Sequence, residues 1–324
     1  MECPIVPEFP TLGAIDRLDE RLDGLIAADA PIELLDVGFA WPEGPVWVAS
    51  EAHLLFSDIP RNSIYRWSED GGTGVWMQPS GYTGVAYYGK EPGSNGLTLD
   101  REGRLLACEH GDRRVSRLEH GEGKVTLADS YQGRRLNSPN DLVLRSNGDL
   151  YFTDPAYGLH HRYDDPAREL PFCGVYLVRP GEREPVLLTD ELENPNGLAF
   201  SPDERLLYVT QSNPRRAIVT SYPVLADGSL GGGSVLIDLT EFAAEAPGLP
   251  DGMKVDRAGN IFTTGPGGVW VAAPDGTLLG RVSTGRRIAN LCWGGDGSVL
   301  YLCSDDYLCR VGTLTSGCLP GPPA

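Results

Sequence analysis

The sequence predicts an all-β protein, a six-bladed β-propeller built from one repeating unit. Glycine and proline make up about a fifth of the 324 residues, which suits many short strands joined by turns. A polar residue precedes a short apolar strand six times, at intervals of 39 to 56 residues. Each unit holds about four short strands, the period and content of propeller blades. Such a unit cannot bury both faces of its own sheet, so the units must stack around an axis. We call the six polar residues the openers: Glu43, Asn95, Asn140, Asn196, Asp251 and Asn290.

Composition narrows the class of protein. A hydrophobic content of 41% is enough for a large core. The net charge of −18 argues against nucleic acid as a partner and is compatible with divalent cations. Seven scattered cysteines suggest buried apolar residues rather than a disulfide framework. We find no export signal or membrane span in the sequence, so we expect a cytoplasmic protein with no membrane contact. The oligomeric state stays open, and a dimer is among the alternatives.

Residues 1–31 differ from the repeats and are predicted to form an N-terminal helical extension. Apolar residues recur there at a spacing of three to four among charged ones, which is typical of an amphipathic helix. We expect this helix to dock on the propeller, which would occupy residues 32–324. The alternative is a surface for a partner or for self-association. The apolar positions are Leu12, Ile15, Leu18, Leu22, Leu25 and Ile26.

The elements then follow in order. A strand is expected at 32–39, before the first opener, and the first unit continues with strands at 53–57 and 63–67. The later units run from 95 to 108, from 140 to 153, from 196 to 222, from 251 to 264 and from 290 to about 311. The last unit supplies only three strands, so we predict that the strand at 32–39 completes its sheet and closes the ring.

The openers have a chemical consequence. The first strand of each blade lines the central channel, so the openers should converge on the axis as a ring of two carboxylates and four amides. An all-oxygen set of this kind suits a hard cation, and Ca²⁺ better than Mg²⁺. Asn-Gly and Asp-Gly are also common hairpin turns. The hairpin turns of this chain, however, fall a few residues later, as at 101–103 and 257–259.

Four motifs resemble the SMP-30/gluconolactonase family over about residues 32–311. They are PEGPVW at 42–47, RLNSPND at 135–141, PNGLAFS at 195–201 and LPDGMKVD at 249–256. The resemblance implies a six-bladed propeller with one divalent ion, usually Ca²⁺ with Mg²⁺, Mn²⁺ or Zn²⁺ as alternatives. It implies that the ion is held by Glu43, Asn140, Asn196 and Asp251. It further implies hydrolysis of a sugar lactone, with the ion polarising the carbonyl and Asp251 as the general base.

Further residues are candidates for contact with substrate or ligands. Strand direction should return Asp58, His110, Asp154, Ser212 and Asp305 to the face of the openers, where His110 could relay a proton. The resemblance places Arg135 at a substrate-contacting position and Asn95 near the site. We expect the loops at 73–93 and 156–172 to cover the channel and set specificity.

Two other functions compete with lactone hydrolysis. One is a non-catalytic propeller that binds a partner and keeps a structural Ca²⁺, and the other is hydrolysis of phosphotriesters on the same scaffold. A serine esterase is disfavoured because the sequence has no Gly-x-Ser-x-Gly motif.

Overall fold

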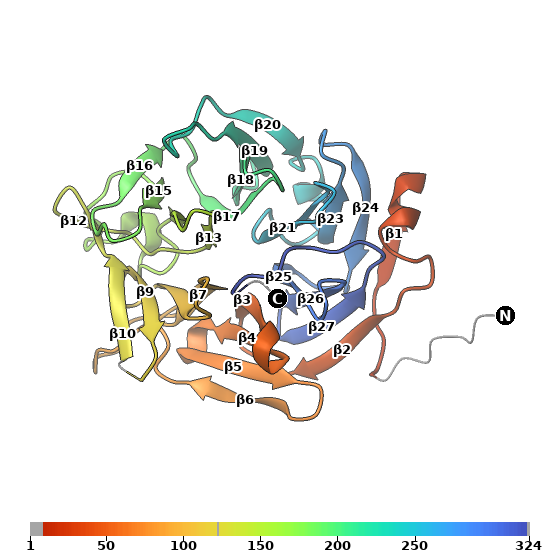
Figure 1. The fold of residues 1–324 in the computed structure, drawn as a ribbon, viewed down its shortest axis with the longest axis horizontal. Helices are drawn as coiled ribbons and strands as arrows, with labels where there is room; N and C mark the ends of the chain where they lie inside the picture. Colours follow the sequence, from red (N-terminus) through yellow and green to blue (C-terminus); the bar gives the residue numbers. More distant parts are fainter. Residues whose placement is uncertain (1–8, 122, 323–324) are drawn as a thin grey trace.

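The protein is a six-bladed β-propeller in a computed structural model that describes residues 9–121 and 123–322. Six sheets surround one axis, and the chain passes from red through green to blue around the ring (Figure 1). The hydrophobic core lies between neighbouring blades. One cluster, for example, joins Leu106 and Val115 of the second blade to Phe152 and Tyr176 of the third. None of the helices in the described part of the chain is long and apolar enough to cross a membrane.

Each blade is an antiparallel sheet whose strands follow one another from the axis outward. The first three blades contain β3 (Pro42–Val48), β4 (His53–Asp58), β5 (Ser63–Ser68) and β6 (Gly72–Met77); β7 (Ser94–Leu99), β8 (Leu105–Glu109), β9 (Arg114–Glu119) and β10 (Gly123–Ala128); and β13 (Leu142–Leu144), β14 (Leu150–Asp154), β15 (Gly174–Val178) and β16 (Val186–Thr189).

The other three blades include two strands from the N-terminal region. They contain β17 (Pro195–Phe200), β18 (Leu206–Gln211), β19 (Ile218–Pro223) and β20 (Ser234–Asp238); β21 (Met253–Val255), β22 (Ile261–Gly265), β23 (Gly268–Ala272), β24 (Leu278–Ser283) and β1 (Ala14–Arg17); and β25 (Ile288–Gly294), β26 (Val299–Ser304), β27 (Tyr307–Gly312) and β2 (Ile32–Val37). The segments that connect these strands contain the hairpin of β11 (Ser130–Tyr131) and β12 (Arg134–Arg135) and the short 3-10 helices η1 (Glu20–Gly24), η2 (Ala49–Glu51), η3 (Ile59–Arg61), η4 (Arg162–Asp164) and η5 (Phe242–Ala244).

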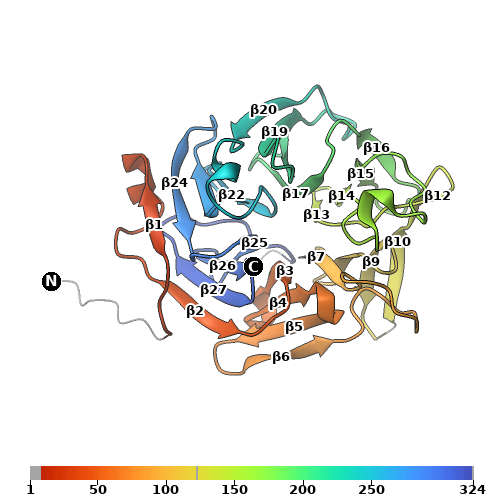
Figure 2. The same ribbon diagram turned by 180° about the vertical axis from the view of Figure 1, so that it is seen from behind.

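The ring is closed by β2, as the sequence predicts. This strand pairs antiparallel with β27, with Ile32 opposite Val311, and becomes the outermost strand of the last blade. In Figure 2 the red-orange β2 lies beside the blue β27. First and last blade are thereby joined by backbone hydrogen bonds and not only by side chains.

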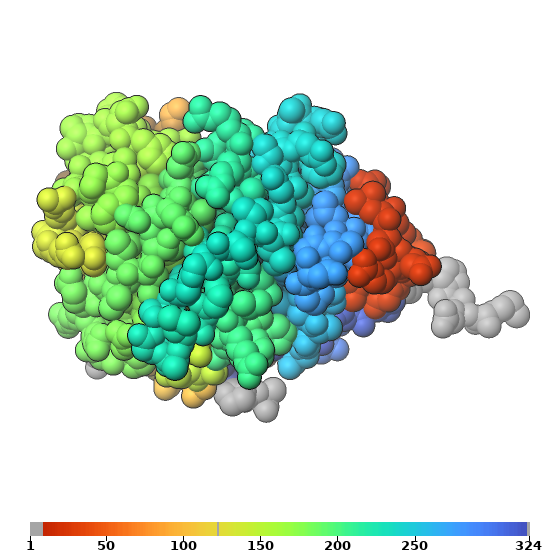
Figure 3. Space-filling model, turned by 90° about the horizontal axis from the view of Figure 1, so that it is seen from above, coloured from red at the N-terminus to blue at the C-terminus, as the bar shows by residue number. Residues whose placement is uncertain are grey.

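The prediction of an N-terminal helix is wrong. Residues 14–17 form the strand β1, which pairs with β24, and only the short η1 follows it; residues 1–8 of the predicted helix lie outside the described residues. The open edge of β24 offers unpaired N–H and C=O groups, which a strand satisfies and a helix cannot. Leu22 and Ile26 are fully buried against the fifth and sixth blades, whereas Leu18 is exposed. Figure 3 shows this segment in red against the blue blade.

The direction of the innermost strands defines two faces of the propeller. These strands begin at one face, which we call the opener face, and run to hairpin turns at the other, the turn face. In two of these turns an aspartate accepts backbone N–H groups: Asp100 from Glu102 and Arg104, and Asp256 from Ala258 and Asn260. The real turns therefore lie a strand's length away from the openers.

Candidate functional site

The openers converge on the axis at the opener face. Glu43, Asn95 and Asn196 lie in the innermost strands of their blades, Asn140 and Asp251 just before them, and Asn290 within β25. All except Asp251 are buried, and Asp251 is partly buried. Buried polar side chains are costly unless they have partners, so a ring of six needs an explanation beyond turn formation.

The glycines that follow four of the openers explain part of the motif. The N–H of Gly96 donates to the carbonyl of Asn140 over 2.8 Å, and the N–H of Gly197 donates to the carbonyl of Asp251 over 3.1 Å. A Cβ at Gly44, Gly96, Gly197 or Gly252 would lie within 3.0 Å of an atom in the opener of the next blade. These glycines are needed because neighbouring blades approach closely there.

A chain of amides links three openers. Asn95 Nδ2 donates to Asn140 Oδ1 over 2.8 Å, Asn140 Nδ2 donates to Asn196 Oδ1 over 2.5 Å, and Asn196 Nδ2 donates to Ser212 Oγ over 2.9 Å. Ser212 Oγ donates onward to the carbonyl of Pro250, beside Asp251. The amides are thus held in fixed positions relative to one another.

Two carboxylates complete the ring. Burial raises the pKa of Glu43 to about 7, although the N–H of Gly44 donates to its Oε2 over 3.0 Å. Burial of the carboxyl group also raises the pKa of Asp251 well above its ordinary value, and the negative charge of Glu43 adds to the effect. Two acids that repel each other in a buried place are stabilised either by protons or by a cation.

The ring has the donors that a hard cation requires. The described residues hold no group of three or more His, Cys, Asp and Glu that could bind a metal, so any ion here takes two carboxylates and completes its coordination with amide oxygens or water. Asn95 Oδ1 is buried without a hydrogen-bond partner among the described residues. Oxygen-only coordination with two charged ligands suits Ca²⁺. For Asn140 and Asn196 to contribute, their amide oxygens must turn from the neighbouring amide towards the ion.

His110 and Glu91 border the ring. His110 is fully buried; its Nε2 lies 3.3 Å from Asn140 Oδ1 and its Nδ1 lies 3.5 Å from Glu91 Oε2. Glu91 Oε1 accepts a hydrogen bond from Arg162 over 3.4 Å. Its charge contributes to the raised pKa values of Glu43 and Asp251. Glu91 was not predicted from the sequence, where its one signal is its place in a loop expected to cover the channel.

Tyr157 was missed as well. Its hydroxyl is buried and has no hydrogen-bond partner among the residues that the structure describes. Burial raises the pKa of Tyr157, and the nearby Tyr163 and Asp251 add to the shift. This tyrosine belongs to the second loop expected over the channel, between β14 and β15. The side chain of Tyr157 therefore contributes a hydroxyl group without a hydrogen-bond partner in the neighbourhood of Asp251.

The other predicted residues lie farther out. Asp154 is buried and accepts the N–H groups of Asn137 and Ser138, each over 2.8 Å, so it holds the loop that leads to Asn140. Asp58 accepts two N–H groups in the same way, before Glu43. Arg135 is exposed at the rim, where it lines a cavity of about 670 Å³. In the described part of the chain Arg135 forms no hydrogen bond or ion pair with an opener, and Asp305 pairs with Arg287.

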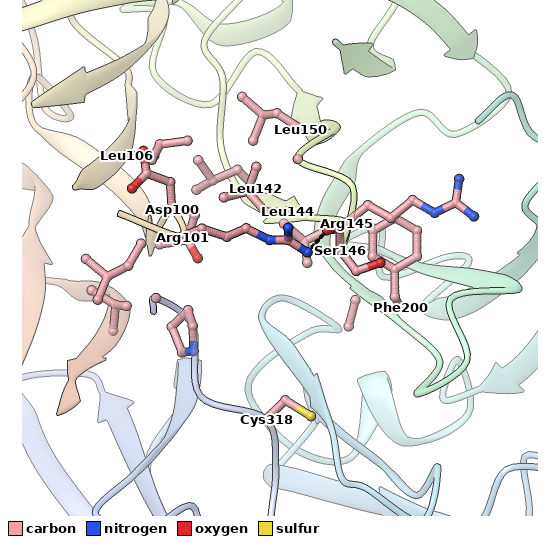
Figure 4. Close-up of a pocket in the computed structure, with 18 of the residues that line it drawn as sticks. Asp100, Arg101, Leu106, Leu142, Leu144, Arg145, Ser146, Leu150, Phe200 and Cys318 are labelled. Carbon is pink, nitrogen blue, oxygen red and sulfur yellow. Dashed lines mark hydrogen bonds between the residues drawn. The ribbon is translucent and has the colours of Figure 1, made fainter. Parts of the chain in front are cut away.

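A second cavity, of about 730 Å³, lies at the turn face (Figure 4). Leu142, Leu144 and Phe200 line it together with Arg101 and Arg145, and the C-terminal segment with Cys318 passes alongside. Arg145 is paired with Glu204. This cavity contains none of the openers.

The fold and the ring define the class of protein: a six-bladed propeller with a polar site at one mouth of its channel. Residues 41–305 match the family described as the SMP-30/gluconolactonase/LRE-like region. A gluconolactonase of Zymomonas mobilis is 36% identical over 314 residues, which cover 95% of this chain and 88% of that protein. The chain belongs to the SMP-30/gluconolactonase/LRE-like family.

Two further relatives agree with this assignment. A pentonolactonase of Haloferax volcanii is 29% identical over 273 residues, which cover 81% of this chain and 80% of that protein. The solved structure of a gluconolactonase from Xanthomonas campestris matches with a TM-score of 0.80 at 29% identity, over 96% of this chain and 100% of that chain.

Proposed function

We propose that the protein is a lactonase that hydrolyses a sugar lactone at the ring of openers, with a divalent cation held by Glu43, Asn140, Asn196 and Asp251. The family and the relatives named gluconolactonase and pentonolactonase support lactone hydrolysis. The observation that carries the cation is the pair of mutually repelling carboxylates among amide oxygens, the buried Glu43 and the partly buried Asp251. Ca²⁺ is the ion that this donor set favours.

The residues of the chain have separate roles in this reaction. A bound cation supplies Lewis-acid polarisation of the lactone carbonyl. Asp251 takes a proton from the attacking water as that water bonds to the carbonyl carbon. The ring C–O bond then breaks, and the ring oxygen takes up the proton to leave as a hydroxyl group of the hydroxy acid. In this proposal the unpartnered hydroxyl of Tyr157, whose pKa the charge of Asp251 helps to raise, hydrogen-bonds the reacting oxygen atoms.

The rim of the site favours a hydroxylated substrate over an apolar one. Glu91 and Arg162 come from the two loops that meet over the ring, and both side chains can hydrogen-bond sugar hydroxyls. Their mutual contact, at 3.4 Å, is long. Both groups therefore have hydrogen-bonding capacity left for a ligand.

A panel of lactones tests the proposal. Hydrolysis is followed with a pH indicator for five- and six-membered sugar lactones and for alkyl lactones of the same ring size, before and after EDTA and with Ca²⁺, Mg²⁺, Mn²⁺ or Zn²⁺ restored. We expect sugar lactones to be hydrolysed, EDTA to abolish the activity and Ca²⁺ to restore it. Activity that survives complete chelation would rule out the cation, and a preference for alkyl lactones would rule out the sugar.

A further inference from the structure

The rim cavity of about 670 Å³ contains a buried arginine that the proposed reaction does not use. The cavity lies between blade 2 and the two covering loops, and Tyr82, Tyr88, Arg113, Arg135 and His160 are among its lining residues. The hydroxyl of Tyr88 donates to the carbonyl of His110 over 3.0 Å. The cavity therefore adjoins the ring of openers through the residue pair Tyr88 and His110.

Arg113 is 4% exposed, and its guanidinium is held in place by the backbone. Its Nε donates to the carbonyls of Leu136 and Asn137, over 2.8 and 3.0 Å, and its Nη1 donates to the carbonyl of Ala167 over 2.9 Å. Its Nη2 is buried and has no partner in the described part of the chain. A buried, charged N–H group without an acceptor is costly, and a ligand oxygen would satisfy it.

The backbone conformation of Arg113 is also compatible with a ligand at this side chain. Its φ of 57° lies in the left-handed region, which is uncommon for a residue with a branched or long side chain. Such conformations are kept where the surrounding structure requires them, and they are enriched at ligand sites. Arg113 is the last residue of the turn between β8 and β9, and its side chain is buried rather than extended into solvent.

Arg135 supplies a second positive charge in the same cavity. Its Nη2 donates to the carbonyl of Asp112 over 3.0 Å. Among residues 9–121 and 123–322, neither Arg113 nor Arg135 forms an ion pair with a carboxylate, whereas the neighbouring Arg114 pairs with Glu109 over 2.6 Å. Burial lowers the pKa of Arg113, and the positive charge of Arg135 adds to this effect. The two guanidinium groups thus repel each other without a shared anion.

Three acidic residues also line the cavity, but protein groups already engage them. Asp112 accepts hydrogen bonds from the N–H and hydroxyl of Thr83, Asp165 accepts from the N–H groups of His161 and Ala167, and Asp129 accepts from the hydroxyl of Ser130. The polar atom that lacks a partner among these lining residues is therefore a donor, Arg113 Nη2.

We infer that Arg113 and Arg135 form an oxyanion site beside the ring, which takes a carboxylate or phosphate group. Guanidinium groups with parallel N–H bonds suit both kinds of oxyanion. A lactonase produces one of them, because each turnover releases a hydroxy acid with a carboxylate. This link to the product rests on the proposed function, whereas the anion site itself does not.

Calorimetric titration with inorganic phosphate tests the site without using lactonase activity. We expect the unmodified protein to bind phosphate and both R135Q and R113K to bind it about tenfold more weakly or worse, because each loses hydrogen bonds to a charged group. R113K keeps the charge and so limits damage to the fold, which thermal melting checks. R101Q is the matched control: Arg101 is also exposed and donates to a backbone carbonyl, but at the turn face.

The outcomes separate the alternatives. Loss of binding in R135Q and R113K with full binding in R101Q supports the site. Equal binding in all variants would overturn it, because the phosphate would then bind at the ring or elsewhere. Absence of phosphate binding in the unmodified protein would overturn it as well. Titration with gluconate in place of phosphate identifies the source: weakening by R135Q assigns the site to the product carboxylate, and gluconate that binds independently of R135Q restricts it to phosphate. Gluconolactone hydrolysis, assayed separately, shows whether the proposed function stands.

Discussion

Gly197 and Asp251 join two neighbouring blades at the axis. The N–H of Gly197 donates to the carbonyl of Asp251 over 3.1 Å, and a Cβ at Gly197 would come within 3.0 Å of the same oxygen. The glycine therefore sets the distance between the blades at the point where two openers meet. Motif and site are linked by this contact, because any shift of the backbone there moves the carboxylate of Asp251.

We expect Gly197→Ala to destabilise the protein by about 1 to 3 kcal/mol, as overpacking in a rigid core does. The obstructing atom is a backbone oxygen, which cannot rotate away. Urea unfolding measures the change. Gly232→Ala is the control, since a Cβ there meets nothing within 4 Å, and it should change stability by no more than about 0.5 kcal/mol. Equal stabilities of the two variants would contradict the tight contact between the blades.

Tyr157→Phe separates function from stability. Its hydroxyl is buried without a partner, so its removal should leave the free energy of unfolding unchanged or raise it by about 1 kcal/mol. If the hydroxyl assists the reaction, kcat/KM should fall about tenfold or more. Tyr176→Phe is the matched control, because Tyr176 also has a buried, unpartnered hydroxyl but lies in the core between the second and third blades. Equal kcat/KM in both variants would remove Tyr157 from the mechanism.

Glu43→Gln should have opposite effects with and without metal. In the metal-free protein the change removes one of the two ring acids that repel each other, so the melting temperature should rise. If the ring binds Ca²⁺ as proposed, a hundredfold excess over Kd should stabilise the unmodified protein by about 2.7 kcal/mol through mass action. We expect this gain to be lost in Glu43→Gln. Thermal melting with EDTA and with Ca²⁺ measures both effects, and an equal Ca²⁺ response in the two proteins would argue against Glu43 as a ligand.

The raised pKa of Asp154 predicts that the stability of the protein depends on pH. Burial raises its pKa to about 7 from an ordinary value of 3.8. Between these values the folded protein holds a proton that the unfolded chain has lost, so this residue makes stability fall as the pH rises from about 4 to 7 and then level off. Relative to Asp154→Asn, the unmodified protein should therefore lose about 1 kcal/mol or more between pH 5 and 7. Urea unfolding at pH 5, 6, 7 and 8 checks this, and a constant difference would contradict it.

The local pattern of the sequence contained much of the fold. Openers recur before apolar strands because each blade must begin at the axis, so the repeat predicted the six blades and their order. The strand at 32–37 stands before the first opener, and this position led to the correct closure of the last blade. The same repeat placed all six openers at the axis, and the family resemblance selected Glu43, Asn140, Asn196 and Asp251 among them as the proposed ligands.

Contacts between distant segments were decided by the tertiary structure. Residues 14–17 become a strand because the folded fifth blade offers an open edge at β24, which periodicity of the segment itself does not reveal. Glu91 and Tyr157 owe their places to loops whose paths depend on packing over the channel, and Arg113 bonds to Ala167 of one of these loops. No local pattern therefore marks these residues. The sequence alone thus determined which residues surround the axis, because strand order and strand direction are local properties. The tertiary structure decided which groups face that ring and which buried polar atoms lack partners, because both depend on where the rest of the chain packs.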